Sequence, residues 1–341
     1  MEKTKVILDV DTGSDDAIAI MEAILHPALD VLAITTVNGN KPLPNTTENT
    51  LRVIDLMGVG DKVPVYMGCE DPMVAELLPD RHAESRQAPQ KKVVDGEVIE
   101  YHSEHLDMIP PSHTKAQEKR AVPFLIDTLM ASEGDITLIP VGPLTNIALA
   151  MRAEPRIKEK IKKIVIMGGG HNKTNRTCAA EFNIWKDPEA AQIVFTSGCD
   201  VLLVPLDATH AGDVTMAESQ AIREIGTPIA AAVADLLDQR IKAYDMFQPQ
   251  KIAGSTPPHD ALAVASVIDP DVLRDVQFRR VDVDFSGGIC DGRTMVDPRV
   301  YPDNPPNIHI ALDCDRERFV KLLTDTIALS KDPDWWEKQA K

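Results

Sequence analysis

Short apolar runs alternate with segments of helical periodicity along the first two thirds of the chain. A short apolar run bounded by turn residues is typical of a buried strand, whereas apolar residues at every third or fourth position are typical of a helix. The pattern predicts strands at residues 6–10, 31–37, 63–66, 136–141, 164–167 and 201–206. It predicts helices at residues 15–25, 45–57, 124–130, 144–151 and 187–194.

Regular alternation of strands and helices favours an α/β fold with a doubly wound, mostly parallel, Rossmann-like sheet and flanking helices. The last third adds helices at 230–244, from 260, and at 316–329, with a strand at 308–312. No repeat or shift in composition divides the chain, so we expect a single domain over residues 1–341. Residues 69–119 are polar and lack periodicity, which predicts an irregular, lid-like excursion over the strand ends.

Composition narrows the class of protein. The chain has 43% hydrophobic residues, enough for a large core, and 53 acidic against 36 basic residues, a net charge of −17. This charge argues against a nucleic acid polymer or an anionic membrane surface as partner. Five scattered cysteines without Cys-x-x-Cys spacing, no signal peptide and no long apolar run predict a cytoplasmic protein with reduced thiols.

Four aspartates crowd the point where the first strand meets the first helix, namely Asp9, Asp11, Asp15 and Asp16. In open α/β sheets, ligands bind at the carboxyl ends of the strands. Carboxylates this close together repel one another, and a helix N-terminus offsets only part of the charge. A hard divalent cation with oxygen ligands resolves the repulsion most simply.

These aspartates also form a motif. Residues 8–17 resemble the amino-terminal pattern Asp-x-Asp-x-Gly-x-Asp-Asp-Ala of the inosine-uridine preferring nucleoside hydrolase family. Further similar segments follow in the family's order at 36–40, 141–146, 167–170, 175, 180–183, 187–190, 205–207 and 259–263. The resemblance implies the nucleoside hydrolase fold and hydrolysis of the N-glycosidic bond of a ribonucleoside, or a related N-riboside, to ribose and free base.

The resemblance also implies a catalytic Ca²⁺, with ligands from Asp11, Asp16, the backbone carbonyl of Val141, and Asp260. Calcium accepts six to eight such oxygen ligands in irregular geometry. Asp11 would act as the general base toward the attacking water.

The substrate contacts implied by the resemblance surround a ribose. Asp15 and Asn183 would bind the 2′-hydroxyl, and Asn175 and Glu181 the 5′-hydroxyl. Asn40 would order the water or a ribose oxygen, and Asp260 would contact the sugar as well as the metal. Acids and amides suit this task because hydroxyl groups need both donors and acceptors.

His259, immediately before Asp260, would be the general acid that protonates the departing nucleobase. A pKa in the neutral range suits that role. Arg240 and Tyr244, four residues apart on a predicted helix, are further candidates for the base pocket. The family usually forms homo-oligomers, so we expect a homodimer or homotetramer acting on a small nucleoside.

Two alternatives remain open. Residues 9–13 also resemble the signature of aspartate-nucleophile phosphatases, in which Asp9 would be the nucleophile and Mg²⁺ the metal. The chain could also be a Ca²⁺-dependent nucleoside- or sugar-binding protein without turnover. Residues 101–106 depart from the His-Gly and Gly-Leu-Gly lid of relatives, which leaves the nucleobase undetermined.

Overall fold

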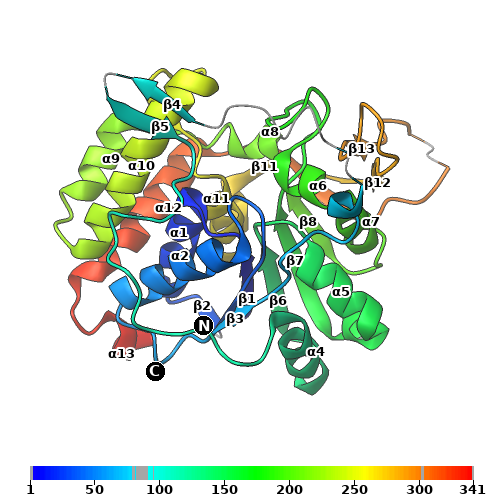
Figure 1. Ribbon diagram of the computed structural model, residues 1–341, viewed down its shortest axis with the longest axis horizontal. Helices are drawn as coiled ribbons and strands as arrows, with labels where there is room; N and C mark the ends of the chain where they lie inside the picture. The colour runs from blue at the N-terminus through cyan, green and yellow to red at the C-terminus, as the bar shows by residue number, and fades with distance from the viewer. Residues whose placement is uncertain (1–2, 79–80, 82–90, 95, 301–302, 340–341) are drawn as a thin grey trace.

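The computed structural model describes residues 3–78, 81, 91–94, 96–300 and 303–339 (Figure 1). Within them lies an eight-stranded sheet. Its spatial order is β11 (Leu273–Arg279), β14 (Ile308–Cys314), β8 (Val201–Val204), β7 (Ile161–Met167), β6 (Ile136–Pro140), β1 (Thr4–Val10), β2 (Leu29–Thr36) and β3 (Val65–Met67). All neighbouring strands run parallel except β11, which is antiparallel to β14. The predicted doubly wound, mostly parallel sheet is confirmed.

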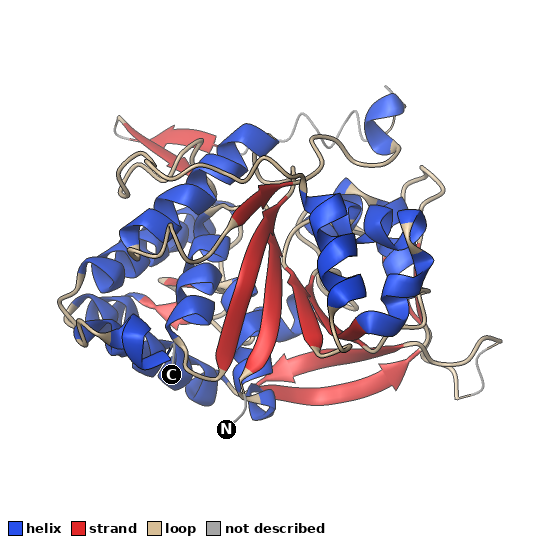
Figure 2. Ribbon diagram, turned by 90° about the horizontal axis from the view of Figure 1, so that it is seen from below, coloured by secondary structure: helices blue, strands red, loops and turns tan. Residues whose placement is uncertain are grey.

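Helices cover both faces of this sheet (Figure 2). Because side chains alternate along a strand, β1 sends Val6, Leu8 and Val10 to one core and Ile7 to the other. The first core takes α1 (Ser14–Leu25), α2 (Leu43–Leu56), α9 (Met216–Arg223), α10 (Pro228–Phe247), α11 (His259–Ile268) and α12 (Arg316–Ala328). The second takes α4 (Ala121–Ala131), α5 (Thr145–Ala153) and α7 (Pro188–Phe195).

Strand β1 lies between β2 and β6, so the chain turns in opposite directions on its two sides. Such a switch in strand order leaves a crevice at the carboxyl ends of the central strands. Asp11 follows β1 and Val141 follows β6, and both therefore enter this crevice.

The polar segment 69–119 is more ordered than predicted. It contains a short helix η1 (Ala75–Leu77) and an antiparallel hairpin, β4 (Lys91–Val94) and β5 (Glu97–Glu100), that packs on α10. Leu106 and Ile109 are buried, and the guanidinium of Arg52 donates to both their carbonyls. Residues 79–80, 82–90 and 95 of this segment lie outside the described part of the chain.

Other elements were missed or misplaced by the sequence pattern. The predicted strand 201–206 is wrong in its last two residues, because Pro205 precedes α8 (Leu206–Thr209). The edge strand β11 escaped prediction because most of its residues are polar and most are exposed at least in part. The remaining short elements are β12 (Val281–Val283), β13 (Thr294–Val296), β9 (Val214–Thr215), β10 (Ser255–Thr256), α6 (Phe182–Lys186), α13 (Trp335–Gln339), η2 (Pro155–Lys160), η3 (Pro270–Val272) and η4 (Leu329–Lys331).

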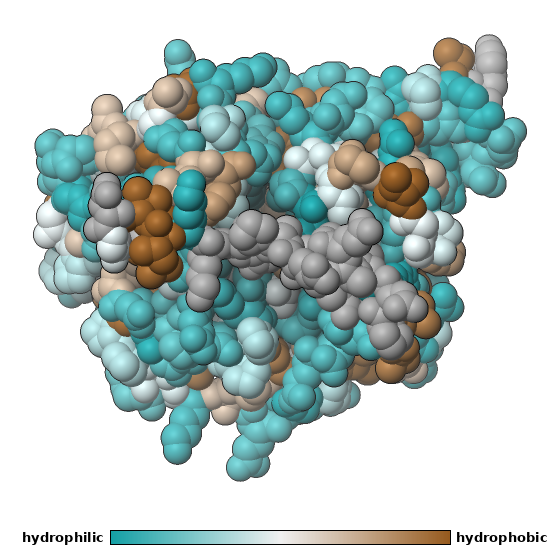
Figure 3. Space-filling model, turned by 45° about the horizontal axis from the view of Figure 1, so that its top comes forward, coloured by the Kyte–Doolittle hydropathy of each residue, from teal (hydrophilic) through white to brown (hydrophobic). Residues whose placement is uncertain are grey.

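The surface agrees with the composition. The face in Figure 3 is mostly hydrophilic where it is coloured, with small separate apolar areas. Among the described residues, every helix is too short or too polar to span a bilayer. All five cysteines are free thiols, which agrees with the absence of a disulfide framework.

Candidate active site

A cavity of about 520 Å³ opens at the carboxyl ends of the central strands. Most of the side chains singled out from the sequence line it: Asp15, Asn40, Val141, Asn175, Glu181, Asn183, His259 and Asp260. Asp11 and Asp16 are also close, but they are buried beneath the cavity surface. The fold therefore brings segments from the whole chain to one place.

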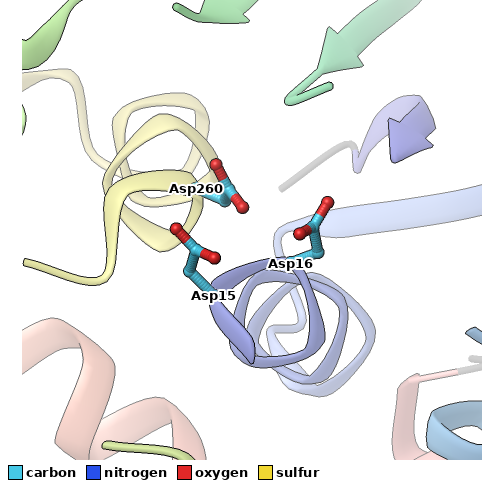
Figure 4. A group of neighbouring side chains, drawn as sticks. All are labelled: Asp15, Asp16 and Asp260. Carbon is cyan, nitrogen blue, oxygen red and sulfur yellow. The ribbon is translucent and has the colours of Figure 1, made fainter. Parts of the chain in front are cut away.

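Three carboxylates gather at the floor of this cavity, two of them lining it and Asp16 just beneath (Figure 4). Asp15 and Asp16 stand in the first turn of α1, and Asp260 stands in the first turn of α11, which packs against α1. One oxygen of each lies within 4.8 Å of the other two, and all three residues are buried. Burial raises the pKa of Asp16 to about 7 and that of Asp260 well above its usual value, with Asp15 adding repulsion in both cases. This donor set contains only anionic oxygens, which fits a hard divalent cation.

Asp16 also fixes the turn that enters α1. Its Oδ1 accepts from the backbone N–H of Asp11 at 3.1 Å, and its Oδ2 accepts from that of Gly13 at 2.9 Å. Asn40 adds a side-chain N–H at 3.3 Å to Oδ2. These bonds hold the carboxylate in place before any ligand binds.

Asp11 lies beside this group without belonging to it. Its Oδ2 accepts from the Asn40 backbone N–H at 2.6 Å. A Cβ at Gly39 would come within 2.1 Å of Oδ2, and a Cβ at Gly142 within 2.7 Å of Oδ1. The two glycines therefore make room for this carboxylate. Burial, followed by repulsion from Asp16, raises the pKa of Asp11 well above its usual value.

The backbone carbonyl of Val141 accepts a hydrogen bond from Asn183 Nδ2 at 2.7 Å. The same amide reaches the carbonyl of Met167 at 3.2 Å, so it ties the ends of β6 and β7 together. A carbonyl oxygen has two lone pairs, which leaves Val141 able to accept a second partner.

Glu181 and Asn175 hold the loop that forms one wall of the cavity. Glu181 accepts from the backbone N–H groups of Gly169, Asn183 and Ile184, and caps α6. Asn175 Oδ1 accepts from the Phe182 backbone N–H at 2.9 Å. Burial raises the pKa of Glu181 to about 7, although the backbone donors act against this. Both side chains border the cavity while shaping its loop.

His259 is buried at the edge of the cavity, immediately before Asp260 in α11. Its Nε2 is 2.6 Å from the Tyr244 hydroxyl, and its Nδ1 is 2.7 Å from the hydroxyl of Thr209. Burial, then the neighbouring His210, lowers the pKa of His259 well below its usual value. Desolvation therefore favours the uncharged imidazole, and the role of His259 as general acid stays a prediction.

Two side chains near α1, those of Arg240 and His102, make contacts that the sequence did not predict. Arg240, a candidate for the base pocket, lines the cavity and also pairs with Asp15, with 2.9 Å between Nη1 and Oδ1. His102 Nδ1 accepts from the Ser14 backbone N–H at 3.2 Å and lies 3.9 Å from Asp15 Oδ1. Burial lowers the pKa of His102 to about 4. No spacing in the sequence signals either contact, because both partners are remote along the chain.

Asp9 points away from the cavity. Its Oδ1 accepts from Asn146 Nδ2 at 2.7 Å and from the Thr35 hydroxyl, inside the sheet. Burial raises its pKa to about 7. A buried carboxyl group held in this way is not available as a nucleophile, which disfavours the phosphatase alternative.

Comparisons with known proteins agree with this geometry. The model of the family described as inosine-uridine preferring nucleoside hydrolase matches residues 6–321. The pyrimidine-specific ribonucleoside hydrolase RihB of Escherichia coli (strain SE11) is 40% identical over 329 residues, which are 96% of this chain and 98% of the relative.

Solved structures of the same kind are also similar. The purine-preferring ribonucleoside hydrolase from Gardnerella vaginalis has a TM-score of 0.80 and 32% identity, covering 96% of this chain and 99% of that one. The plant nucleoside hydrolase PpNRh1 has a TM-score of 0.81 and 29% identity, covering 95% and 99%. With a family match across nearly its whole length, this chain is an N-glycosyl hydrolase and belongs to the inosine-uridine preferring nucleoside hydrolase family.

Proposed function

We propose that this enzyme binds Ca²⁺ and uses water to cleave the N-glycosidic bond of ribonucleosides, releasing ribose and the free base. The observation that carries the proposal is the buried group of Asp15, Asp16 and Asp260 at the floor of a cavity of about 520 Å³. Small-molecule sites have volumes of roughly 300–1,000 Å³, so a nucleoside fits.

The proposed ligands of the cation are Asp11, Asp16, Asp260 and the Val141 carbonyl. Burial of these acids supports the assignment, since uncompensated buried carboxylates are costly and a divalent cation removes the repulsion. When bound, the cation supplies Lewis acidity, which lowers the pKa of a coordinated water.

Asp11 is the proposed general base. It lies beneath the cavity next to Asn40, which fixes its Oδ2 through the backbone N–H. A carboxylate that touches both the cation and a coordinated water is placed to take the proton of that water.

The ribose is proposed to bind to the polar residues around the floor and along the wall that the loop of Asn175 and Glu181 forms. Asp15 and Asn183 are proposed to bind the 2′-hydroxyl, Glu181 and Asn175 the 5′-hydroxyl, and Asn40 a ribose oxygen or the water, while Asp260 also contacts the sugar. Asn183 uses its amide N–H groups on Val141 and Met167, so its carbonyl oxygen is the group that accepts from a hydroxyl. The acids place negative charge beside a ribosyl ring that becomes cationic as the bond breaks.

Protonation of the departing base is proposed to run through Tyr244 rather than through a charged His259. Thr209 donates to Nδ1 of the neutral imidazole, Nε2–H donates to the Tyr244 oxygen, and the Tyr244 hydroxyl donates to the base. Short contacts join both imidazole nitrogens to these hydroxyls, so His259 holds the Tyr244 hydroxyl in place. Tyr244 regains its proton from solvent after the products leave, which balances the proton that Asp11 takes from the attacking water.

The nucleobase, assembly and location remain predictions. The relatives carry both pyrimidine-specific and purine-preferring names, and the cavity offers Tyr101, Tyr244 and Phe247 as aromatic surface for either base. A homodimer or homotetramer and a cytoplasmic location remain as expected from the sequence.

The direct test is release of reducing sugar from a panel of uridine, cytidine, inosine, adenosine and guanosine, with added Ca²⁺ or with chelator. We expect turnover of at least one ribonucleoside, lost in chelator and restored by Ca²⁺. Binding of nucleosides without any release of ribose would instead support the non-catalytic alternative.

A further inference from the structure

Arg240 stands out because it places a fully buried cation against an acidic group that is itself expected to bind a cation. Its side chain is 1% exposed and that of Asp15 is 8% exposed. Asp15 belongs to the same group of three carboxylates as Asp16 and Asp260. The two partners come from α10 and α1, which pack together.

The guanidinium is held rigidly. Besides Asp15, Nη1 donates to the Ser14 hydroxyl at 3.0 Å, and Nη2 donates to the Pro257 carbonyl at 3.0 Å. The Tyr244 ring lies with its centroid 5.4 Å from the guanidinium carbon. Anchors on three sides prevent the charge from moving toward Asp16 or Asp260, so Asp15 is its fixed partner.

The three acids are therefore not equivalent. Asp15 has its own buried counter-ion, whereas Asp16 is held by neutral N–H groups of the α1 turn. The Asp260 side chain has neither kind of anchor among the described residues, although the charge of Arg240 also acts on it. One arginine and one divalent cation carry three positive charges, which balance the three carboxylates, and an ionised Asp11 then adds one negative charge.

We infer that Arg240 is a positioning residue that reserves Asp15 for a ribose hydroxyl and keeps it out of the coordination sphere of the cation. This inference rests on the proposed function. An ionised carboxylate held by an arginine remains a good acceptor for a hydroxyl, because each oxygen has more than one acceptor site. The same fixed positive charge lowers the attraction of the whole group for Ca²⁺.

The inference predicts effects of opposite sign on two ligands. In Arg240→Met, the affinity for Ca²⁺ rises by roughly tenfold or more, since a nearby positive charge is removed and Asp15 becomes a ligand. The kcat/KM for a ribonucleoside falls by about a hundredfold, mainly through KM, because Asp15 no longer faces the sugar. Arg240→Lys keeps the charge, so its Ca²⁺ affinity stays near that of the wild type while part of the loss in kcat/KM persists.

Calorimetric titration of each apo variant with Ca²⁺ alone measures the first effect without turnover. Arg223→Met is the matched control, since Arg223 bridges Asp235 and Asp238, both at 2.7 Å, in a partly exposed position outside the cavity. It should alter neither Ca²⁺ affinity nor kinetics. Thermal melts establish folding, and if Arg240→Met does not fold, Arg240→Gln replaces it in the comparison with Arg240→Lys.

Kinetics on uridine and 2′-deoxyuridine measure the second effect. Loss of Arg240 should lower kcat/KM only slightly for the deoxynucleoside, so the ratio of kcat/KM between the two sugars should approach one. Weaker Ca²⁺ binding in Arg240→Met, or equal losses on both sugars, would overturn the inference. If the wild-type enzyme hydrolyses no nucleoside, the proposed function is wrong. Comparing the Ca²⁺ affinities of the wild type, Arg240→Met and Arg240→Lys would still test the role of Arg240.

Discussion

Burial shifts the pKa values of the acids and of the imidazoles at the cavity in opposite directions. Among the acids at and beneath the floor, burial raises the pKa of Asp11, Asp16 and Asp260. Among the imidazoles that border the cavity, burial lowers the pKa of His259 and His102. Low polarity favours the neutral form of every group, so it protonates acids and deprotonates imidazoles.

The acids and the imidazole differ in what offsets the energetic cost of their burial. The floor needs an added cation, because protonation or repulsion is otherwise the only outcome for three adjacent acids. The imidazole of His259 needs none, since the hydroxyls of Thr209 and Tyr244 satisfy both nitrogens. We therefore expect a metal ion to stabilise the acids of the floor, and hydrogen bonds to hydroxyl groups to stabilise the imidazole near the leaving group.

The largest expected effect is on the floor. Asp11→Ala should lower kcat by about a thousandfold or more, because it removes the base, and it should weaken Ca²⁺ binding as well. Steady-state kinetics and calorimetry measure the two losses, with exposed Asp30→Ala as control. Turnover at a normal rate would mean that the assignment of Asp11 as base and ligand is wrong.

A smaller, substrate-dependent effect is expected on the other side. His259→Ala should lower kcat on inosine or uridine by about a hundredfold, but by much less on p-nitrophenyl riboside, whose leaving group needs no proton. Tyr244→Phe should give the same pattern, because it removes the hydroxyl that donates to the base. Equal losses on both substrates would rule out a proton-donor role for this pair.

The floor should also respond to pH and chelator. The folded-state pKa of Asp16 is raised to about 7 from 3.8, so without metal its contribution to stability is present below pH 3.8 and is lost as pH rises through 7. Calcium requires the deprotonated acid, so the increase in melting temperature on adding Ca²⁺ should be larger at pH 8 than at pH 5. The same increase at both values would contradict the proposed use of these carboxylates.

The smallest expected effect separates the hydrolase from the phosphatase. Asp9→Asn should change kcat by less than about threefold, because an amide oxygen can still accept from Asn146 and Thr35. Hydrolysis of nucleosides and of a phosphomonoester is measured side by side. A phosphorylated enzyme that disappears in Asp9→Asn would establish Asp9 as a nucleophile.

Prediction from sequence succeeded where the signal is local. The run from Val6 to Leu8 is apolar on both faces, as a central parallel strand must be, and the aspartates begin directly after it. Prediction failed for β11, where Arg274, Asp275 and Gln277 give no apolar run and pairing with β14 alone makes the strand. It also failed for the hairpin β4–β5, whose support comes from α10, far along the chain.

The motifs by themselves determined which residues gather at the cavity, because the carboxyl ends of parallel strands necessarily meet at one edge of a sheet. Only the tertiary structure decided how they are paired and charged. Arg240 contacts Ser14, which is 226 positions away in the sequence, and burial lowers the pKa of His259. Long-range contact and desolvation depend on the packed surroundings of a side chain, and the spacing of residues along the chain carries no record of either.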